Sequence, residues 1–159
     1  MDTRMWIAVG VFVALNFVAA SSGGMFKPGV WYAGLKKPGW TPPNLAFPIV
    51  WGFLFAINAW AGWLVWEVAG TGEPLVFAAY VVSLVLNAGW SWLFFGRRRM
   101  DLALIDVGLL WLSLVVVIAL FWPLRPFAAL LLLPYLGWVT IAALLNLRMI
   151  QLNPDAQPA

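Results

Sequence analysis

The feature that most limits the fold of this chain is a series of five long apolar segments. They cover residues 5–25, 45–66, 75–95, 102–122 and 127–150. Each has close to the ~20 residues that a helix needs to cross ~30 Å of hydrocarbon. Only 9% of the 159 residues are charged, against about 25% in a soluble domain. The sequence therefore predicts an all-α membrane protein, with residues 1–159 forming a single bundle of five transmembrane helices.

The first segment has a second interpretation, a cleaved signal peptide. Arg4, the apolar run and the Ala19-Ala20-Ser21 sequence are typical of one. However, Asp2 offsets the charge of Arg4, and the apolar run is longer than a signal peptide usually has. We therefore interpret this segment as the first membrane span.

Lysine and arginine are concentrated on one side of the predicted bundle. The first loop, the third loop and the C-terminal region hold Lys27, Lys36, Lys37, Arg97, Arg98, Arg99 and Arg148. The opposite side holds only Arg4 and Arg125. Because cytoplasmic loops carry an excess of positive charge, we expect the first loop and the C-terminus in the cytoplasm and the N-terminus outside. The net charge of +3 thus reflects topology, and we expect no nucleic-acid partner.

The first loop, from Lys27 to about Asn44, is rich in proline and aromatic residues. It contains Trp31, Tyr32, Trp40, Pro28, Pro38, Pro42 and Pro43. A loop that only connects two helices is usually polar and flexible. This composition favours a lid that folds onto the bundle, and the alternative is a loop lying in the interfacial aromatic belt.

Three segments place polar and aromatic residues along one helical face. These stripes are Trp51, Phe55, Asn58 and Gly62; Asn87, Trp90, Ser91 and Phe94; and Pro134, Trp138, Ala142 and Asn146. For a single asparagine, a hydrogen bond between helices explains such a position well. Three stripes with both amides and indoles also predict a shared aromatic cavity, suited to a flat, apolar ligand.

Two further features have alternative explanations. Asp106 lies about one turn inside the fourth segment, where a salt bridge to Arg97, Arg98 or Arg99 is favoured over a role in proton transfer or ligand binding. Small residues at Ala79 and Ser83 continue towards Asn87 and Ser91, a pattern that often brings helices together. This stripe either lies within the chain or forms the contact of a homodimer.

The absence of cysteine and histidine limits the available chemistry. Without them the chain has no thiolate nucleophile, no imidazole ligand and no general base near neutral pH. We expect no metal site and no required cofactor. The chain has 12 tryptophans, which is more than membrane anchoring requires.

Three motifs in order give the chain a strong resemblance to the translocator protein family. They are Trp31-Tyr32-x-x-Leu35-x-Lys37-Pro38-x-Trp40-x-Pro42-Pro43 with Phe47-Pro48-x-x-Trp51, then Asn87-x-x-Trp90-Ser91-x-x-Phe94-Phe95-Gly96-x-Arg98-x-Met100, and finally Pro134-Tyr135-Leu136-x-Trp138-x-x-x-Ala142-x-x-Leu145-Asn146. The family includes bacterial tryptophan-rich sensory proteins and animal peripheral-type benzodiazepine receptors. The resemblance covers essentially the whole chain.

The resemblance implies a five-helix bundle, commonly a homodimer, with a pocket closed by the first loop. Its implied ligands are porphyrins such as protoporphyrin IX and other planar lipophiles. The matching pocket positions are Tyr32, Trp40, Pro42, Phe47, Trp51, Phe55, Asn87, Trp90, Ser91, Trp138, Ala142 and Asn146. Among these, Trp51 and Trp138 match the tryptophans implicated in light-dependent breakdown of protoporphyrin by bacterial members.

The function implied is therefore porphyrin binding, with tryptophan-dependent photo-oxidative degradation or sensing. Two alternatives stay open: a transporter or escort of tetrapyrroles or other lipophiles, and a ligand-gated scaffold or regulator. The sequence lacks the tyrosine that the family's sterol-recognition segment needs after Asn146, because Leu147 and Arg148 follow, so we do not expect tight sterol binding. Helical spans and the resemblance to bacterial members favour the bacterial cell membrane as its location.

Overall fold

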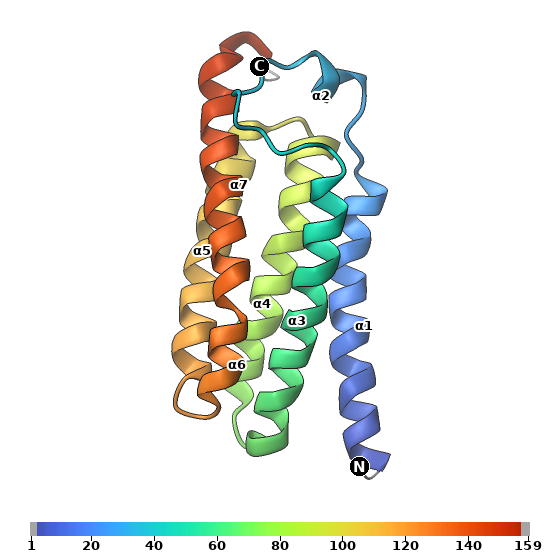
Figure 1. Cartoon of the computed structure of the whole chain (residues 1–159), viewed down its shortest axis with the longest axis vertical. Helices are drawn as coiled ribbons and strands as arrows, with labels where there is room; N and C mark the ends of the chain where they lie inside the picture. Colours follow the sequence, from blue (N-terminus) through green and yellow to red (C-terminus); the bar gives the residue numbers. More distant parts are fainter. Residues whose placement is uncertain (1–2, 157–159) are drawn as a thin grey trace.

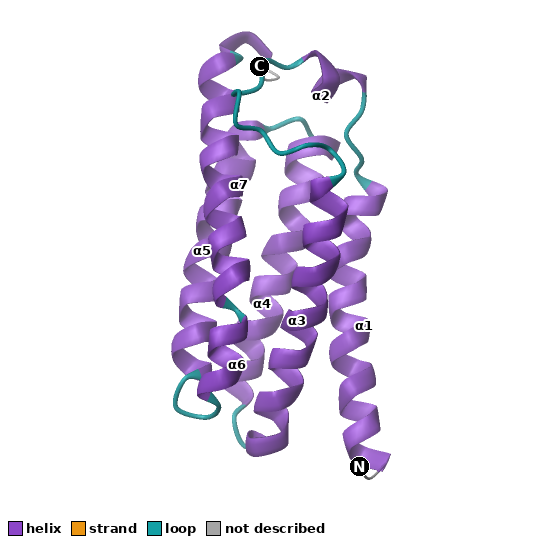
Figure 2. Ribbon diagram, in the orientation of Figure 1, coloured by secondary structure: helices purple, strands orange, loops and turns teal. Residues whose placement is uncertain are grey.

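A computed structural model describes residues 3–156 as a long bundle of helices, and no strand occurs within that range (Figures 1 and 2). The elements are α1 (Thr3–Met25), α2 (Val30–Gly34), α3 (Ala46–Ala69), α4 (Pro74–Ser91), the π-helical segment η1 (Trp92–Gly96), α5 (Met100–Phe121), α6 (Pro126–Leu131), α7 (Leu133–Leu152) and the short 3-10 turn η2 (Pro154–Ala156). The predicted all-α architecture is confirmed. The two ends of the predicted 1–159 domain lie outside the described residues.

Five of these stretches are long and apolar enough to cross a membrane, as predicted. They are Thr3–Met25, Ala46–Ala69, Pro74–Gly96, Met100–Phe121 and Pro126–Leu152. The last is divided into α6 and α7 beside Pro134. Proline has no N–H to bond to the preceding turn, so the helix is interrupted there.

The helices pack side by side, and the two connections that flank α3 lie at opposite ends of the bundle. α1 packs on α3 and α4, α4 on α5, α5 on α7, and α3 on α6. The first loop, with α2, lies at the same end as the C-terminus, and the N-terminus lies at the other (Figure 1). Seven of the nine cationic residues therefore gather at the end that carries the first loop.

A buried polar network joins α1, α3 and α4 towards the N-terminal end. Asn16 Nδ2 donates to the Tyr80 hydroxyl at 2.6 Å and accepts at Oδ1 from Asn58 Nδ2 at 2.8 Å. The Tyr80 hydroxyl donates to the Asn58 carbonyl at 3.1 Å. Beside this network, a Cβ on Gly62 would lie 2.6 Å from the Phe12 ring, so α1 and α3 can approach this closely only with glycine.

The small-residue stripe of α4 faces the inside of the chain. Ser83 is 1% exposed, and Asn87 and Ser91 are also buried. Because α1 packs on α4 and these side chains are buried, this part of the stripe serves helix packing within one chain. Ala79 is half-buried, and a homodimer contact at its end of the stripe stays a prediction.

Asp106 makes no ion pair within residues 3–156, so its predicted salt bridge to Arg97, Arg98 or Arg99 is wrong. Arg99 pairs instead with Asp101, at 2.5 Å between Nη2 and Oδ2. The Asp106 carboxylate lies against Gly89 of the neighbouring helix. Asp106 lies more than one helical turn further along the span than Asp101, so Asp101 is the nearer partner for the arginines of the loop.

Candidate ligand-binding cavity

A cavity of about 560 Å³ lies in the half of the bundle nearer the first loop. Four membrane-spanning stretches and the end of α1 contribute to its wall, and the first loop covers one end of it. Its size falls in the range of about 300–1,000 Å³ typical of small-molecule sites. Aromatic and small apolar side chains make up most of its surface.

Eight of the twelve predicted site residues line this cavity. They are Tyr32, Phe47, Trp51, Phe55, Asn87, Trp90, Ser91 and Ala142. They come from the loop, α3, α4 and α7, which are far apart in the sequence. Of the predicted stripes, the structure brings Trp51 and Phe55 of α3, Asn87, Trp90 and Ser91 of α4, and Ala142 of α7 to one wall. The stripe asparagines Asn58 and Asn146 do not line it.

The other four lie outside the cavity wall. Trp40 is 49% exposed in the loop, and Pro42 is two residues further on. Trp138 packs edge-on against Phe47, with ring centroids 5.8 Å apart, so it lies behind the wall. Asn146 accepts a hydrogen bond from Trp90 Nε1 at 3.2 Å and donates to the Met100 carbonyl at 2.8 Å. Asn146 thus supports the cavity residue Trp90 from behind.

The sequence analysis missed the contribution of α1 and of the inner faces of α5 and α7. The missed wall residues include Ala19, Ala20, Ser22, Gly23, Gly24, Lys27, Pro28, Asn44, Pro48, Gly52, Phe95, Val107, Leu110 and Val139. A usable signal existed in the run of small residues from Ala19 to Gly24, which leaves space beside a helix. The aliphatic residues gave no such signal, because they resemble any other core position.

Ring contacts and one hydrogen bond fix the orientation of Trp51. Its indole packs on Phe55 with centroids 5.6 Å apart and meets the ring of Tyr135 edge-on at 5.8 Å. Tyr135 is fully buried, and its hydroxyl accepts a hydrogen bond from Asn87 Nδ2 at 2.6 Å. A cavity residue, Asn87, is therefore linked to the indole face through one tyrosine. These contacts hold the Trp51 indole in one orientation at the cavity wall.

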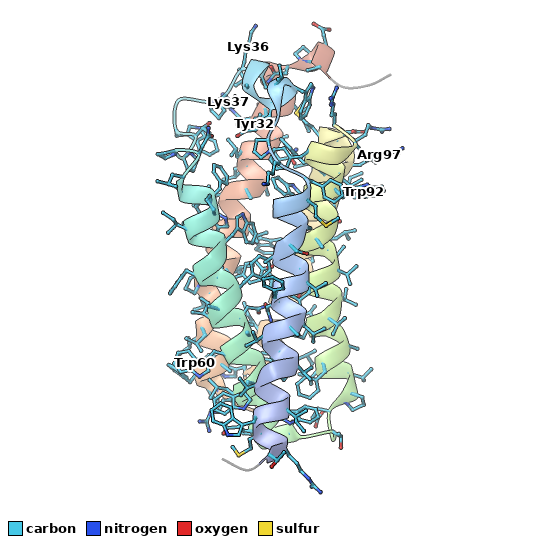
Figure 3. The ribbon with its side chains drawn as sticks, turned by 90° about the vertical axis from the view of Figure 1, so that its right-hand side faces the viewer. Tyr32, Lys36, Lys37, Trp60, Trp92 and Arg97 are labelled. Carbon is cyan, nitrogen blue, oxygen red and sulfur yellow. The ribbon has the colours of Figure 1, made fainter. Side chains whose placement is uncertain are left out.

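A cluster of aromatic rings holds the first loop on the bundle. Tyr32 packs edge-on against Phe94 and Phe95, and Phe94 stacks on Trp90 at 5.0 Å. Burial raises the pKa of the Tyr32 hydroxyl above its ordinary value of 10.0, so this group is neutral at physiological pH. Lys37 lies over the Tyr32 ring, 4.4 Å from its centroid, at the upper end of Figure 3.

A second set of contacts ties the loop to the C-terminal end of the chain. The Asn153 side chain accepts from the Lys36 N–H at 2.8 Å and donates to the Lys36 carbonyl at 2.9 Å. Trp31 Nε1 donates to the Ala156 carbonyl at 3.4 Å. The loop therefore has a defined position over the cavity. That it acts as a lid over a bound ligand stays a prediction.

Comparison with known proteins identifies the family of this chain. The profile of the TspO/MBR family matches residues 8–152, which contain most of the first membrane-spanning stretch and all of the other four. This chain belongs to the TspO/MBR family. The resemblance to translocator proteins drawn from the sequence motifs is thereby confirmed.

The chain is similar to proteins from bacteria and animals. The chain is 36% identical to the tryptophan-rich sensory protein of Cereibacter sphaeroides, over 96% of this chain and 97% of that protein. It is 38% identical to the tryptophan-rich protein TspO of Chlorobaculum tepidum, over 93% and 94% of the two chains. It is also 39% identical to the human translocator protein, over 73% and 70%. The match to bacterial TspO proteins thus extends over nearly the full length of both chains.

Proposed function

We propose that this TspO/MBR family membrane protein binds porphyrins, such as protoporphyrin IX, and related planar lipophilic ligands in its cavity. One observation carries the proposal: a cavity of about 560 Å³ whose wall includes Trp51, Phe55 and Trp90. Indole and phenyl faces offer stacking surfaces to a flat ring system. The polar groups Asn87 and Ser91, on the same wall, would orient the bound ring.

We further propose that tryptophan supports photo-oxidative breakdown of the bound porphyrin. In this step an indole gives one electron to the photoexcited porphyrin and takes it back, so the tryptophan is unchanged overall. Dioxygen is the oxidant consumed: one carbon–carbon double bond of the porphyrin ring breaks, and each of its two carbons becomes a carbonyl with one oxygen atom of the dioxygen. Trp51 lies in the cavity wall, whereas Trp138 is not part of the wall and packs edge-on against the wall residue Phe47. Electron exchange weakens with distance, so Trp51 has the larger effect and Trp138 the smaller one.

The experiment combines binding with illumination of the same sample. Quenching of tryptophan fluorescence by protoporphyrin IX measures binding, and loss of porphyrin absorbance in light and air measures breakdown. Trp51→Phe and Trp138→Phe should keep most of the binding, because an aromatic ring remains. Breakdown should slow in both variants, more in Trp51→Phe, and most in the double variant. Trp60→Phe is the matched control, since Trp60 lies towards the other end of the bundle and is 46% exposed (Figure 3).

Each outcome decides between the candidate functions. Equal breakdown rates in the wild type and the double variant would contradict the photochemical role but leave porphyrin binding standing. Binding without breakdown would favour the two alternative functions, a transporter or escort and a ligand-gated scaffold. Flux into liposomes above the rate of empty vesicles would then favour transport. Absence of quenching in the wild type would contradict porphyrin binding itself.

The proposal includes a setting in the membrane. We propose a homodimer in the bacterial cell membrane, with the N-terminus outside and the first loop and C-terminus in the cytoplasm. Support for the orientation comes from the uneven distribution of lysine and arginine between the two ends. Cross-linking in native membranes that gave only monomer would count against the dimer.

A further inference from the structure

Charge is distributed unevenly along the cavity wall. Lys27 is the one charged residue among the described residues that line it, and it lies where α1 passes into the first loop. Asn44, at the far end of the same loop, adds an exposed amide to the wall. The remainder of the wall is apolar, apart from a few serine and amide groups on the helices. The cavity thus has an aromatic interior and a cationic end.

The positive charge of Lys27 has no partner within residues 3–156. Lys37, in the same loop, differs, because its Nζ donates to the carbonyls of Tyr32 at 2.7 Å and Leu35 at 3.3 Å. Lys37 therefore stabilises the conformation of the loop. The ammonium of Lys27 is free to meet a group brought by the ligand.

We propose that the Lys27 ammonium binds an acidic group of the ligand, so that the cavity selects planar lipophiles that carry a carboxylate at one end. This inference rests on the proposed function and adds the basis of its specificity. The aromatic interior would take the rings, while the acidic group stays at the end covered by the loop. A charge pair at the edge of an apolar cavity is screened less than one on an open surface.

The test compares two porphyrins that share a ring system but differ in charge. Protoporphyrin IX has two carboxylates, and its dimethyl ester has none. Fluorescence quenching in a non-ionic detergent at fixed salt gives the affinity of each for the wild type, Lys27→Gln and Lys27→Arg. Lys36→Gln is the matched control, because Lys36 is an exposed lysine of the same loop and is not part of the cavity wall. Each ligand is compared across variants, so its partition into micelles cancels.

Lys27→Gln should weaken binding of the diacid about fivefold and leave binding of the ester unchanged. Lys27→Arg should keep most of the affinity for the diacid, and Lys36→Gln should change neither ligand. Equal weakening of both ligands by Lys27→Gln would overturn the inference, because it would indicate altered packing. An effect of Lys36→Gln as large as that of Lys27→Gln would also overturn it.

The two proposals fail in different ways. If the wild type binds both porphyrins and Lys27→Gln changes neither affinity, the role of Lys27 is wrong and porphyrin binding stands. If the wild type binds neither porphyrin, the proposed function is wrong and the role of Lys27 fails with it.

Discussion

The bundle has two halves that are built from the same helices but differ in packing. In the half towards the N-terminus, which we call the packed half, Asn16, Asn58 and Tyr80 bond to one another and Phe12 packs closely against Gly62. In the other half, the cavity half, α1 carries a run of small residues from Ala19 to Gly24 beside a space of about 560 Å³. Residue size along α1 therefore distinguishes the solid half of the bundle from the hollow one.

A hydrogen bond between an asparagine and a tyrosine occurs in both halves, with a different role in each. Asn16 donates to the Tyr80 hydroxyl and Asn87 to the Tyr135 hydroxyl, each at 2.6 Å. In the packed half this pair is part of a network that links three helices. In the cavity half Asn87 also lines the cavity, so its amide serves both packing and the site. A buried asparagine in a membrane helix is therefore not by itself a sign of a ligand site.

The largest effect is expected from adding one methyl group in the packed half. Gly62→Ala should lower the free energy of unfolding by about 1–3 kcal/mol, because the new Cβ would meet the Phe12 ring. Gly52→Ala, on the same helix in the cavity half, should cost little, since no atom lies within 4 Å of its Cβ position. Thermal unfolding in detergent, followed by circular dichroism, measures both. Equal losses would mean that the two halves are packed alike.

A smaller effect is expected from replacing the two asparagines with leucine, which has a similar volume. Asn16→Leu removes three hydrogen bonds of a buried network and should lower stability by about 1–2 kcal/mol. Asn87→Leu removes one and should lower stability by about 0.6 kcal/mol, but it should weaken binding of protoporphyrin IX. Melting temperatures and fluorescence quenching separate the two effects. A loss of binding in Asn16→Leu without a loss of stability would contradict the division into halves.

The smallest perturbation tests which half faces the cytoplasm. The chain has no cysteine, so single cysteines at Gly39 and Gly72 can be labelled without background. With seven cations beside the cavity half, we expect an impermeant maleimide added to intact cells to label Gly72→Cys and not Gly39→Cys. The reverse pattern would place the cavity half outside. Both residues lie in connections between helices. A Cβ at Gly39 would meet no atom within 4 Å, whereas one at Gly72 would lie 3.1 Å from the Ala69 carbonyl oxygen, so only Gly72→Cys should lower stability, and only slightly.

The five spans could be predicted from the sequence because length and apolarity alone identify them. The cavity face of α3 was also predictable, since Trp51 and Phe55 occur at helical spacing and do share one wall, whereas of the stripe on α7 only Ala142 lines the cavity. How far the cavity extends along that face was not predictable. Asn58 and Gly62 continue the same stripe but lie in the packed half, because the opposing residue of α1 is there a large Phe12. How far the cavity extends depends on which residues of α1 face α3, so the sequence of one helix alone does not determine it.

Two hydrogen bonds between Asn153 and Lys36 join the C-terminal end of the chain to the loop that lines the cavity. The loop over the cavity cannot move away from the bundle unless these bonds break or the last turn of α7 moves with it. A molecule that bound the C-terminal end would therefore contact the segment that holds the first loop, without touching the cavity wall. The described chain ends at Ala156 on this side, so a tag is safer before Thr3, at the opposite end of the bundle.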